Sequence, residues 1–317
     1  MNRRSFLATG LATGLAAAVA SRAATNKALN KTRVSAISDE VSRSPQEAIE
    51  FARTFGMEWL SLRNIPAPLG SKAVEYHTLD PDELKKVAAE FKAAGIGISF
   101  LDTPFLKFGL PGTEPKRRTP EDPAAREKRI AREKVQFDRR LEDLRLGFRE
   151  GNAFHCNQLR IFTFTRVEQP ESVFPRIADI IGEMSVLCQK EGFRMLIENE
   201  NTQNAGTSVE TAKLIKMLPK NVGINWDSLN GLALGEKPYP DGYEACPKDR
   251  VWNIHVKGKS LLEYPEHLDW PSLLDALDRD GFTGRLELET HIFGEGQIAG
   301  SHASMREIMW LLSARQG

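Results

Sequence analysis

Short apolar runs alternate with longer amphipathic stretches along most of the chain. Four runs in the first half are dense in aliphatic and β-branched residues, as expected of strands buried on both faces: 34–38, 59–63, 96–101 and 158–162. Between the runs, apolar residues recur at helical spacing, as at Ala48, Ile49, Ala52 and Phe55. The pattern therefore predicts repeated strand–helix units.

The residues that flank the apolar stretches predict eight helices: 44–55, 80–95, 123–150, 173–190, 208–217, 243–247, 270–280 and 303–314. Several begin at a Ser-Pro or Asp-Pro pair, whose polar side chain caps a first turn that also accepts proline. A polar insertion, 107–122, follows the third strand. Eight strands alternating with eight helices predict an α/β fold, a single-domain (β/α)8 TIM barrel over 32–317. An open doubly wound sheet would need a glycine-rich loop after the first strand, and Ser38-Asp39-Glu40-Val41 is not one.

The second half carries a further pattern, because each of its four apolar runs ends in a residue that can bind a metal. These residues are Glu198, Asp227, His255 and Glu289, spaced 29, 28 and 34 positions apart, close to one strand–helix–strand unit. A carboxylate or imidazole at the end of a buried strand is costly without a partner. The carboxyl ends of barrel strands meet at one face, so the repeat predicts one shared divalent cation.

The first residues are predicted to be an export leader. Asn2-Arg3-Arg4-Ser5-Phe6-Leu7 resembles a twin-arginine pattern, and an Ala/Gly-rich apolar run, 7–20, leads to small residues at Ala23 and Ala24. We therefore expect residues 1–24 to be removed and the mature protein to lie in the bacterial periplasm. The run is short and glycine-rich for a membrane span, so no stable membrane insertion is expected after cleavage.

The amino-acid composition limits the classes of partner that we expect the protein to bind. Formal net charge is zero, with 43 basic and 43 acidic residues, and the basic residues are dispersed, so no nucleic-acid surface is predicted. The three cysteines, Cys156, Cys188 and Cys246, lack metal-type spacing. We expect small, buried, inert thiols, although a bridge between one pair stays open. Whether the chain forms a homo-oligomer is also left open.

Several motifs, in order, are similar to those of one family. Leu196-Ile197-Glu198-Asn199, Asn225-Trp226-Asp227, His255-Val256-Lys257-Gly258 and the segment from Gly281 to Glu289 resemble the fifth to eighth strands of the xylose isomerase-like TIM barrel superfamily, the sugar phosphate isomerases and epimerases. The resemblance implies that Glu198, Asp227, His255 and Glu289 are metal ligands. Three carboxylates and one imidazole suit Mn²⁺, Mg²⁺ or Co²⁺; Zn²⁺ is an alternative that no thiolate favours.

The resemblance also implies a reaction. In the family's epimerases two facing glutamates move a proton beside a carbonyl, which makes Glu198 and Glu289 the catalytic pair here. The substrate is then a small sugar. We also expect five residues near it: Lys257, Glu200, Arg160, Trp226 and His291. Glu200 stands where many relatives have histidine, which changes the charge and the hydrogen-bonding polarity near the substrate.

Two reactions fit the predicted site. The first is metal-dependent isomerisation or epimerisation through an enediolate. The second is elimination by a lyase or dehydratase acting on a keto-sugar, an inosose or a 3-keto-glycoside. Neither the sugar nor the carbon follows from the sequence. A phosphodiesterase of the endonuclease-IV type would need many more histidines than the six in this chain.

Overall fold

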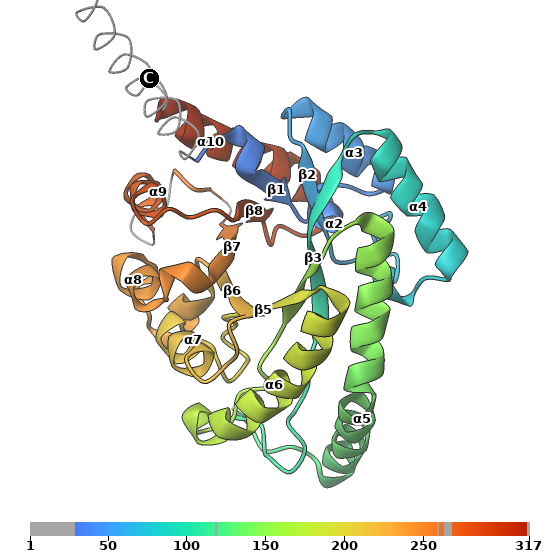
Figure 1. Ribbon diagram of the computed structural model, residues 1–317, viewed down its shortest axis with the longest axis vertical. Coiled ribbons are helices and arrows are strands. Elements are labelled where there is room, and N and C mark those ends of the chain that lie inside the picture. Colours follow the sequence, from blue (N-terminus) through green and yellow to red (C-terminus); the bar gives the residue numbers. More distant parts are fainter. Residues whose placement is uncertain (1–28, 118, 259, 263–267, 316–317) are drawn as a thin grey trace, which may run out of the picture.

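The computed structural model describes residues 29–117, 119–258, 260–262 and 268–315 (Figure 1). The predicted leader lies outside them. Eight parallel strands form the sheet: β1 Val34–Ala36, β2 Trp59–Leu62, β3 Gly97–Phe105, β4 Gln158–Ile161, β5 Arg194–Glu198, β6 Val222–Asp227, β7 Val251–Lys257 and β8 Arg285–Glu289. Each strand from β2 to β7 pairs with the next, and β1 pairs with β8. A bridge between Ile37 and Ser61 joins β1 to β2, so the sheet curls into a nearly closed barrel. The predicted TIM barrel is confirmed.

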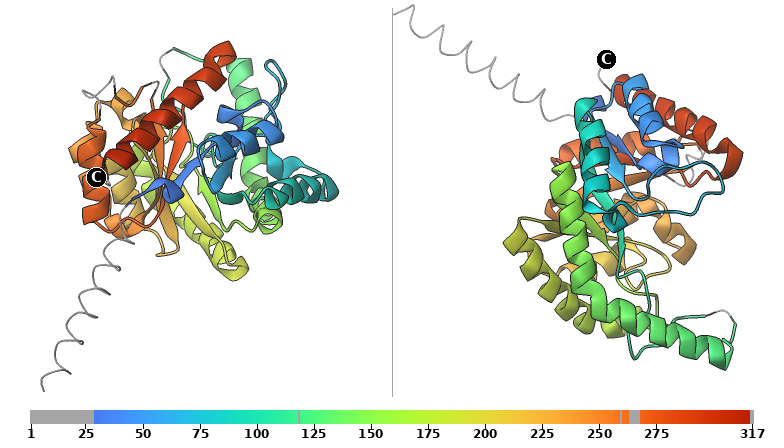
Figure 2. Two further views of the ribbon diagram at one scale, coloured as in Figure 1. Left: turned by 90° about the horizontal axis from the view of Figure 1, so that it is seen from above. Right: turned by 90° about the vertical axis from the view of Figure 1, so that its right-hand side faces the viewer.

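Helices follow the strands and surround the barrel (Figure 2). They are α2 Ser38–Val41, α3 Pro45–Thr54, α4 Pro81–Ala93, α5 Pro123–Phe154, α6 Phe174–Glu191, α7 Ser208–Ile215, α8 Tyr243–Ala245, α9 Trp270–Arg279 and α10 Gln297–Ala314. Among the described residues, no helix combines the length and apolarity needed to cross a membrane.

Side-chain caps explain why most helices begin where the sequence predicted. The side chains of Ser44, Asp80 and Asp122 each accept a backbone N–H from the first turn of the helix that follows, and proline occupies the next position. Thr207 and Glu210 form a reciprocal capping box at α7. These local signals fix the helix starts independently of the barrel.

Three boundaries differ from the sequence prediction by four residues or more: the start of α10, the end of β3, and the end of α5, which lies at Phe154 rather than at residue 150. Helix α10 begins at Gln297 rather than at residue 303, because Gln297 Nε2 donates to the Asp39 carbonyl and Ser301 Oγ to the Glu40 carbonyl. These long-range bonds anchor a first turn whose Gly300 is a poor helix former. Strand β3 extends to Phe105, four residues past the predicted end.

The polar insertion and the start of α5 project beyond the barrel (Figure 2, right). Arg129, almost fully buried, holds this arm together through ion pairs with Glu114 at 3.1 Å, Glu121 at 3.0 Å and Glu133 at 2.8 Å. The arm is therefore stabilised mainly by charge pairs rather than by an apolar core.

The two faces of the sheet differ in chemistry. Outward-facing side chains such as Leu60, Ile98 and Ile224 join the apolar layer between strands and helices. Buried polar side chains lie inside the barrel, where Ser35 Oγ and Ser99 Oγ are 2.8 Å apart and Ser61 Oγ donates to Glu287. The barrel interior is thus polar, and it leads to the strand ends that carry the candidate site.

Candidate metal centre

Four donor residues converge where the last four strands end. Glu198 ends β5, Asp227 ends β6, His255 lies near the end of β7, and Glu289 ends β8. One ligand atom from each lies within 4.8 Å of the others, and all four residues are buried. Parallel pairing places Asp227 opposite His255 and Lys257 opposite Glu289, which aligns the ends at one level. The structure therefore brings together all four predicted ligands.

The hydrogen bonds leave a gap that suits a cation. Asp227 Oδ1 accepts from the backbone of Leu229 at 2.9 Å and of Asn230 at 2.7 Å. Asp227 Oδ2, His255 Nδ1 and Glu289 Oε2, in contrast, are buried and make no well-aligned hydrogen bond. Buried polar atoms without an aligned hydrogen bond are costly. His255 Nδ1 lies 3.8 Å from Asp227 Oδ2 and 3.1 Å from Glu289 Oε2, a mixed set of oxygen and nitrogen donors that suits a divalent ion.

Lys257 reaches the same oxygens. Its Nζ is 2.7 Å from Asp227 Oδ2 and 2.9 Å from Glu289 Oε2, and it donates to Asn230 Oδ1 at 3.0 Å. Burial alone would lower the pKa of Lys257, but these carboxylates raise it, so the side chain stays an ammonium. The lysine therefore partly neutralises the cluster and competes with a metal for the same two oxygens.

The charges of the donors depend on one another. Burial alone would raise the pKa of Glu289, but Lys257 and His255 hold it well below its usual range. The pKa of Asp227 is lowered in the same way: burial would raise it, but Lys257 and His255 together outweigh burial. For His255, burial would lower the pKa, but Glu289 and Glu198 raise it well above its usual value. Asp227 and Glu289 are thus ionised at neutral pH, as metal ligands must be.

Two arginines from the first half hold carboxylates of the site. Arg160 on β4 donates through Nη1 to Glu198 at 2.9 Å and through Nη2 to the Asp102 carbonyl at 2.7 Å. Arg63, next to β2, pairs with Glu40 at 3.0 Å and lies 3.5 Å from Glu289. Arg160 was predicted near the substrate, but the structure shows it buried and bound to Glu198.

Two other predicted residues lie at the rim. Glu200, just after β5, has its Oε2 3.6 Å from Lys107 Nζ at the start of the polar insertion. His291, just after β8, places Nε2 3.2 Å from Glu289 Oε1 while nearly half of its side chain is exposed. The φ of His291 is 51°, in the left-handed region of the backbone. Residues other than glycine seldom adopt this region, and those that do are often found in turns and at functional sites.

The structure does not bring Trp226 to the site. Its Nε1 donates to Ser208 Oγ in α7 at 2.9 Å, and its ring packs edge-on against Tyr243 in α8. Successive side chains on a strand point to opposite faces, so Trp226 must turn outward when Asn225 and Asp227 turn inward. The expectation for Trp226 overlooked this alternation.

Sequence reasoning missed Asp102. This residue is buried with its Oδ1 3.2 Å from His255 Nε2. It was overlooked because it comes one residue after the predicted end of the third strand. Glu287 on β8 is buried as well, and its partners include Ser61, Asn253 and His255.

The comparisons with known proteins identify the family. The family model described as "Xylose isomerase-like TIM barrel" matches residues 49–313. The chain belongs to this family. No curated protein matches it.

Solved structures of the same fold include enzymes of more than one kind. A 3-keto-D-glucoside 4-epimerase from E. coli is 13% identical with a TM-score of 0.59, covering 89% of this chain and 100% of its own. A probable 3-DHS dehydratase from Bacillus anthracis is 15% identical with a TM-score of 0.63, covering 87% and 98%. The IolI protein, solved with a bound zinc atom, is 13% identical with a TM-score of 0.60, covering 89% and 98%. At these identities the likeness shows the fold alone.

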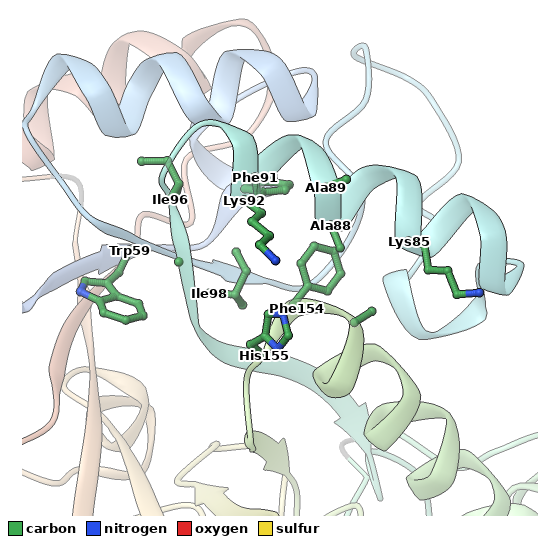
Figure 3. A pocket seen from close by; sticks show the side chains of 12 residues that line it. Trp59, Lys85, Ala88, Ala89, Phe91, Lys92, Ile96, Ile98, Phe154 and His155 are labelled. Carbon is green, nitrogen blue, oxygen red and sulfur yellow. The ribbon is translucent and has the colours of Figure 1, made fainter.

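A separate cavity lies at the other end of the barrel (Figure 3). Its volume is about 420 Å³, and its lining includes Trp59 at the start of β2, Ile98 near the start of β3, Phe91 and Phe154, with Lys92 beside them. It has none of the carboxylates of the candidate centre. Active sites of this fold lie at the carboxyl ends of the strands, so this cavity is not the reaction site.

Proposed function

We propose that this protein is a divalent-metal-dependent sugar isomerase or epimerase that transfers a proton next to a carbonyl. The observation that carries the proposal is the meeting of Glu198, Asp227, His255 and Glu289 within 4.8 Å at the catalytic end of the barrel. Mn²⁺, Mg²⁺ or Co²⁺ fits this donor set, and Zn²⁺ is the alternative. Such a cation, when bound, polarises the substrate carbonyl and favours loss of the neighbouring proton.

The protein's own residues supply the remaining steps. Glu198 or Glu289 takes the proton from the carbon beside the carbonyl, and the carboxylate on the opposite side returns one. Arg160 holds Glu198 in place through the 2.9 Å contact. Lys257 and His291, both within 3.2 Å of Glu289, are placed to bind substrate oxygens.

Elimination is the second candidate. Here the same carboxylate removes the proton, the electron pair forms a carbon–carbon double bond, and a group on the next carbon leaves with its bonding electrons. A departing oxygen needs a proton, and the buried Lys257 ammonium is an acid at the site. A probable dehydratase is among the similar structures, which supports elimination as a candidate reaction. A periplasmic location would favour it further, since we expect phosphorylated sugars to be scarce there.

Deuterium exchange separates the candidates. Mature protein loaded with Mn²⁺ would be incubated in deuterated water with free ketoses, inososes and 3-keto-glycosides, and the recovered sugars examined by NMR. We expect deuterium at one carbon beside the carbonyl. Retention of all oxygens indicates epimerisation or isomerisation, whereas an unsaturated product or a released aglycone indicates elimination. Absence of exchange with all three classes would contradict the proposal.

The export leader remains part of the proposal. Its support is the Arg3-Arg4 pair followed by an apolar run. Changing both arginines to lysine should leave precursor in the cytoplasm, measured by cell fractionation of a tagged protein. Normal export of this double variant would indicate the general secretory route instead.

A further inference from the structure

The imidazole of His255 has two different surroundings. Nδ1 faces the candidate metal centre, with Glu289 Oε2 at 3.1 Å and Glu198 Oε2 at 3.5 Å. Nε2 faces a second pair of carboxylates below the centre, with Asp102 Oδ1 at 3.2 Å and Glu287 Oε1 at 3.3 Å. His255, Asp102 and Glu287 are fully buried. One ring therefore links the centre to two acids that have no other assigned role.

Carboxylates face both nitrogens of the ring. Ionised carboxylates only accept hydrogen bonds, so Asp102 and Glu287 favour a hydrogen on Nε2, and Glu289 favours one on Nδ1 while no cation is bound. Asn225 Nδ2 lies 3.0 Å from Nε2 and donates to Glu198 Oε2 at 3.0 Å. Because an amide nitrogen only donates, its contact with Nε2 acts against the preference of the two carboxylates. A cation bound at the centre would take the place of a hydrogen on Nδ1, and the hydrogen that Asp102 and Glu287 hold on Nε2 would remain.

Glu287 is itself fixed from two sides of the barrel. Ser61 Oγ on β2 donates to its Oε1 at 2.7 Å, and Asn253 Nδ2 on β7 donates to its Oε2 at 3.0 Å. Asp102 sits on β3, with Arg160 Nη1 3.4 Å from its Oδ1. Both acids thus occupy set positions inside a rigid barrel, and they clamp the ring against rotation.

A purely structural role explains this arrangement poorly. Burying a carboxylate costs several kcal/mol unless charge and hydrogen bonds compensate. Glu287 has a hydroxyl, an amide, His255 and the second acid Asp102 as its neighbours, where an apolar side chain would cost less. The cost is understandable if the acids serve the histidine.

We propose that Asp102 and Glu287 are positioning residues that hold His255 with Nε2 protonated and Nδ1 directed at the metal centre. This rests on the proposed function, because it assumes that the centre binds a divalent metal. Outer carboxylates of this kind orient a histidine ligand and make it more basic. Glu287 and Asp102 touch neither substrate nor metal in this role.

Metal affinity tests the proposal directly. Free Mn²⁺ would be measured by EPR during titration of wild type, Glu287→Gln and Asp102→Asn, all metal-free at the start. We expect both variants to bind Mn²⁺ about 10–100-fold more weakly. The matched control is Glu133→Gln, a buried glutamate that pairs with Arg129 in the projecting arm. It should bind Mn²⁺ like wild type.

Two further measurements separate positioning from mere stability. Ser61→Ala removes only the hydroxyl that holds Glu287, so it should fold normally and still lose a few-fold in Mn²⁺ affinity. Nitrogen-15 NMR of histidine-labelled protein with Zn²⁺ should show His255 protonated at Nε2 and coordinated through Nδ1. A structural role alone would change neither the affinity of folded Ser61→Ala nor this signal.

The outcomes are distinct. If wild type binds Mn²⁺ and Glu287→Gln, Asp102→Asn and Ser61→Ala bind it equally well, the positioning role is wrong and the proposed function stands. Coordination through Nε2 would overturn the positioning role as well. If wild type binds none of Mn²⁺, Co²⁺ and Zn²⁺, the proposed metal-dependent function itself fails, and the positioning role falls with it.

Discussion

The two halves of the barrel contribute differently to the centre. The last four strands, β5 to β8, end in the four donors Glu198, Asp227, His255 and Glu289. The first four strands place their charged residues around these donors, with Arg160 on Glu198, Arg63 near Glu289 and Asp102 on His255. Neither half is complete alone, since each would bury charges that the other balances. The site is therefore a property of barrel closure.

Removing a catalytic carboxylate should have the largest effect. Glu198→Gln and Glu289→Gln keep one oxygen donor but lose the base, so proton exchange should fall by about 10²–10⁴-fold. Asp227→Asn should act mainly by weakening metal binding, and excess Mn²⁺ should restore much of its activity. Deuterium exchange at saturating and limiting Mn²⁺ measures both. Full rescue of the glutamate variants by metal would make them ligands only, and the base would then be sought among Glu200, Lys257 and His291.

The second-largest effect should come from a substitution in the first half of the barrel. Arg160→Met leaves the buried Glu198 without its counter-charge, which should destabilise the metal-free protein by about 3–5 kcal/mol. Urea unfolding measures this, and added Mn²⁺ should recover part of the loss because a cation would again neutralise Glu198. Arg140→Met is the control, since Arg140 pairs with the half-exposed Glu183 and should cost at most about 1 kcal/mol. Equal losses in the two variants would show that Arg160 does not support the donors.

The same division decided what the sequence could predict. The donors repeat at near-constant spacing and end apolar runs, so Glu198, Asp227, His255 and Glu289 were found together. Asp102 has no such repeat, and its role appears only when β3 meets β7 across the barrel. A local sequence pattern does not show which residues meet across a closed barrel. Strand alternation, which is local, could have excluded Trp226.

Two buried histidines, one in each half of the barrel, allow the two halves to be compared by changing the pH. His77, after β2, contacts the ring of Phe105, and burial followed by Arg149 lowers its pKa to about 4. Glu75 lies 3.2 Å away, and burial raises its own pKa. His255 in the second half shifts the opposite way, with a raised pKa.

His77 therefore predicts acid sensitivity. The pKa of His77 in the native protein lies below its value of about 6.5 in the unfolded chain. Between about pH 6.5 and 4, His77 is therefore protonated in the unfolded chain but neutral in the native protein. This contribution to stability is complete above that window and is lost as pH falls through it, by up to about 3 kcal/mol. Urea unfolding at pH 7.5 and 5 should show a larger decrease in wild type than in His77→Asn. Parallel decreases would contradict the assignment.

Thiol reactivity should show the smallest contrast between the halves. Cys156 precedes β4, whereas Cys188 and Cys246 belong to the second half; all three are free and buried, and burial raises each pKa to about 12. Only the thiolate reacts, so at pH 8 each native thiol should react with DTNB on the order of 10³-fold more slowly than in guanidinium. The thiols lie outside the polar interior where the halves differ, so we expect equal protection. Rapid labelling of one cysteine in the native protein would indicate local opening of the half that contains it. The two halves would then differ outside the strand ends as well.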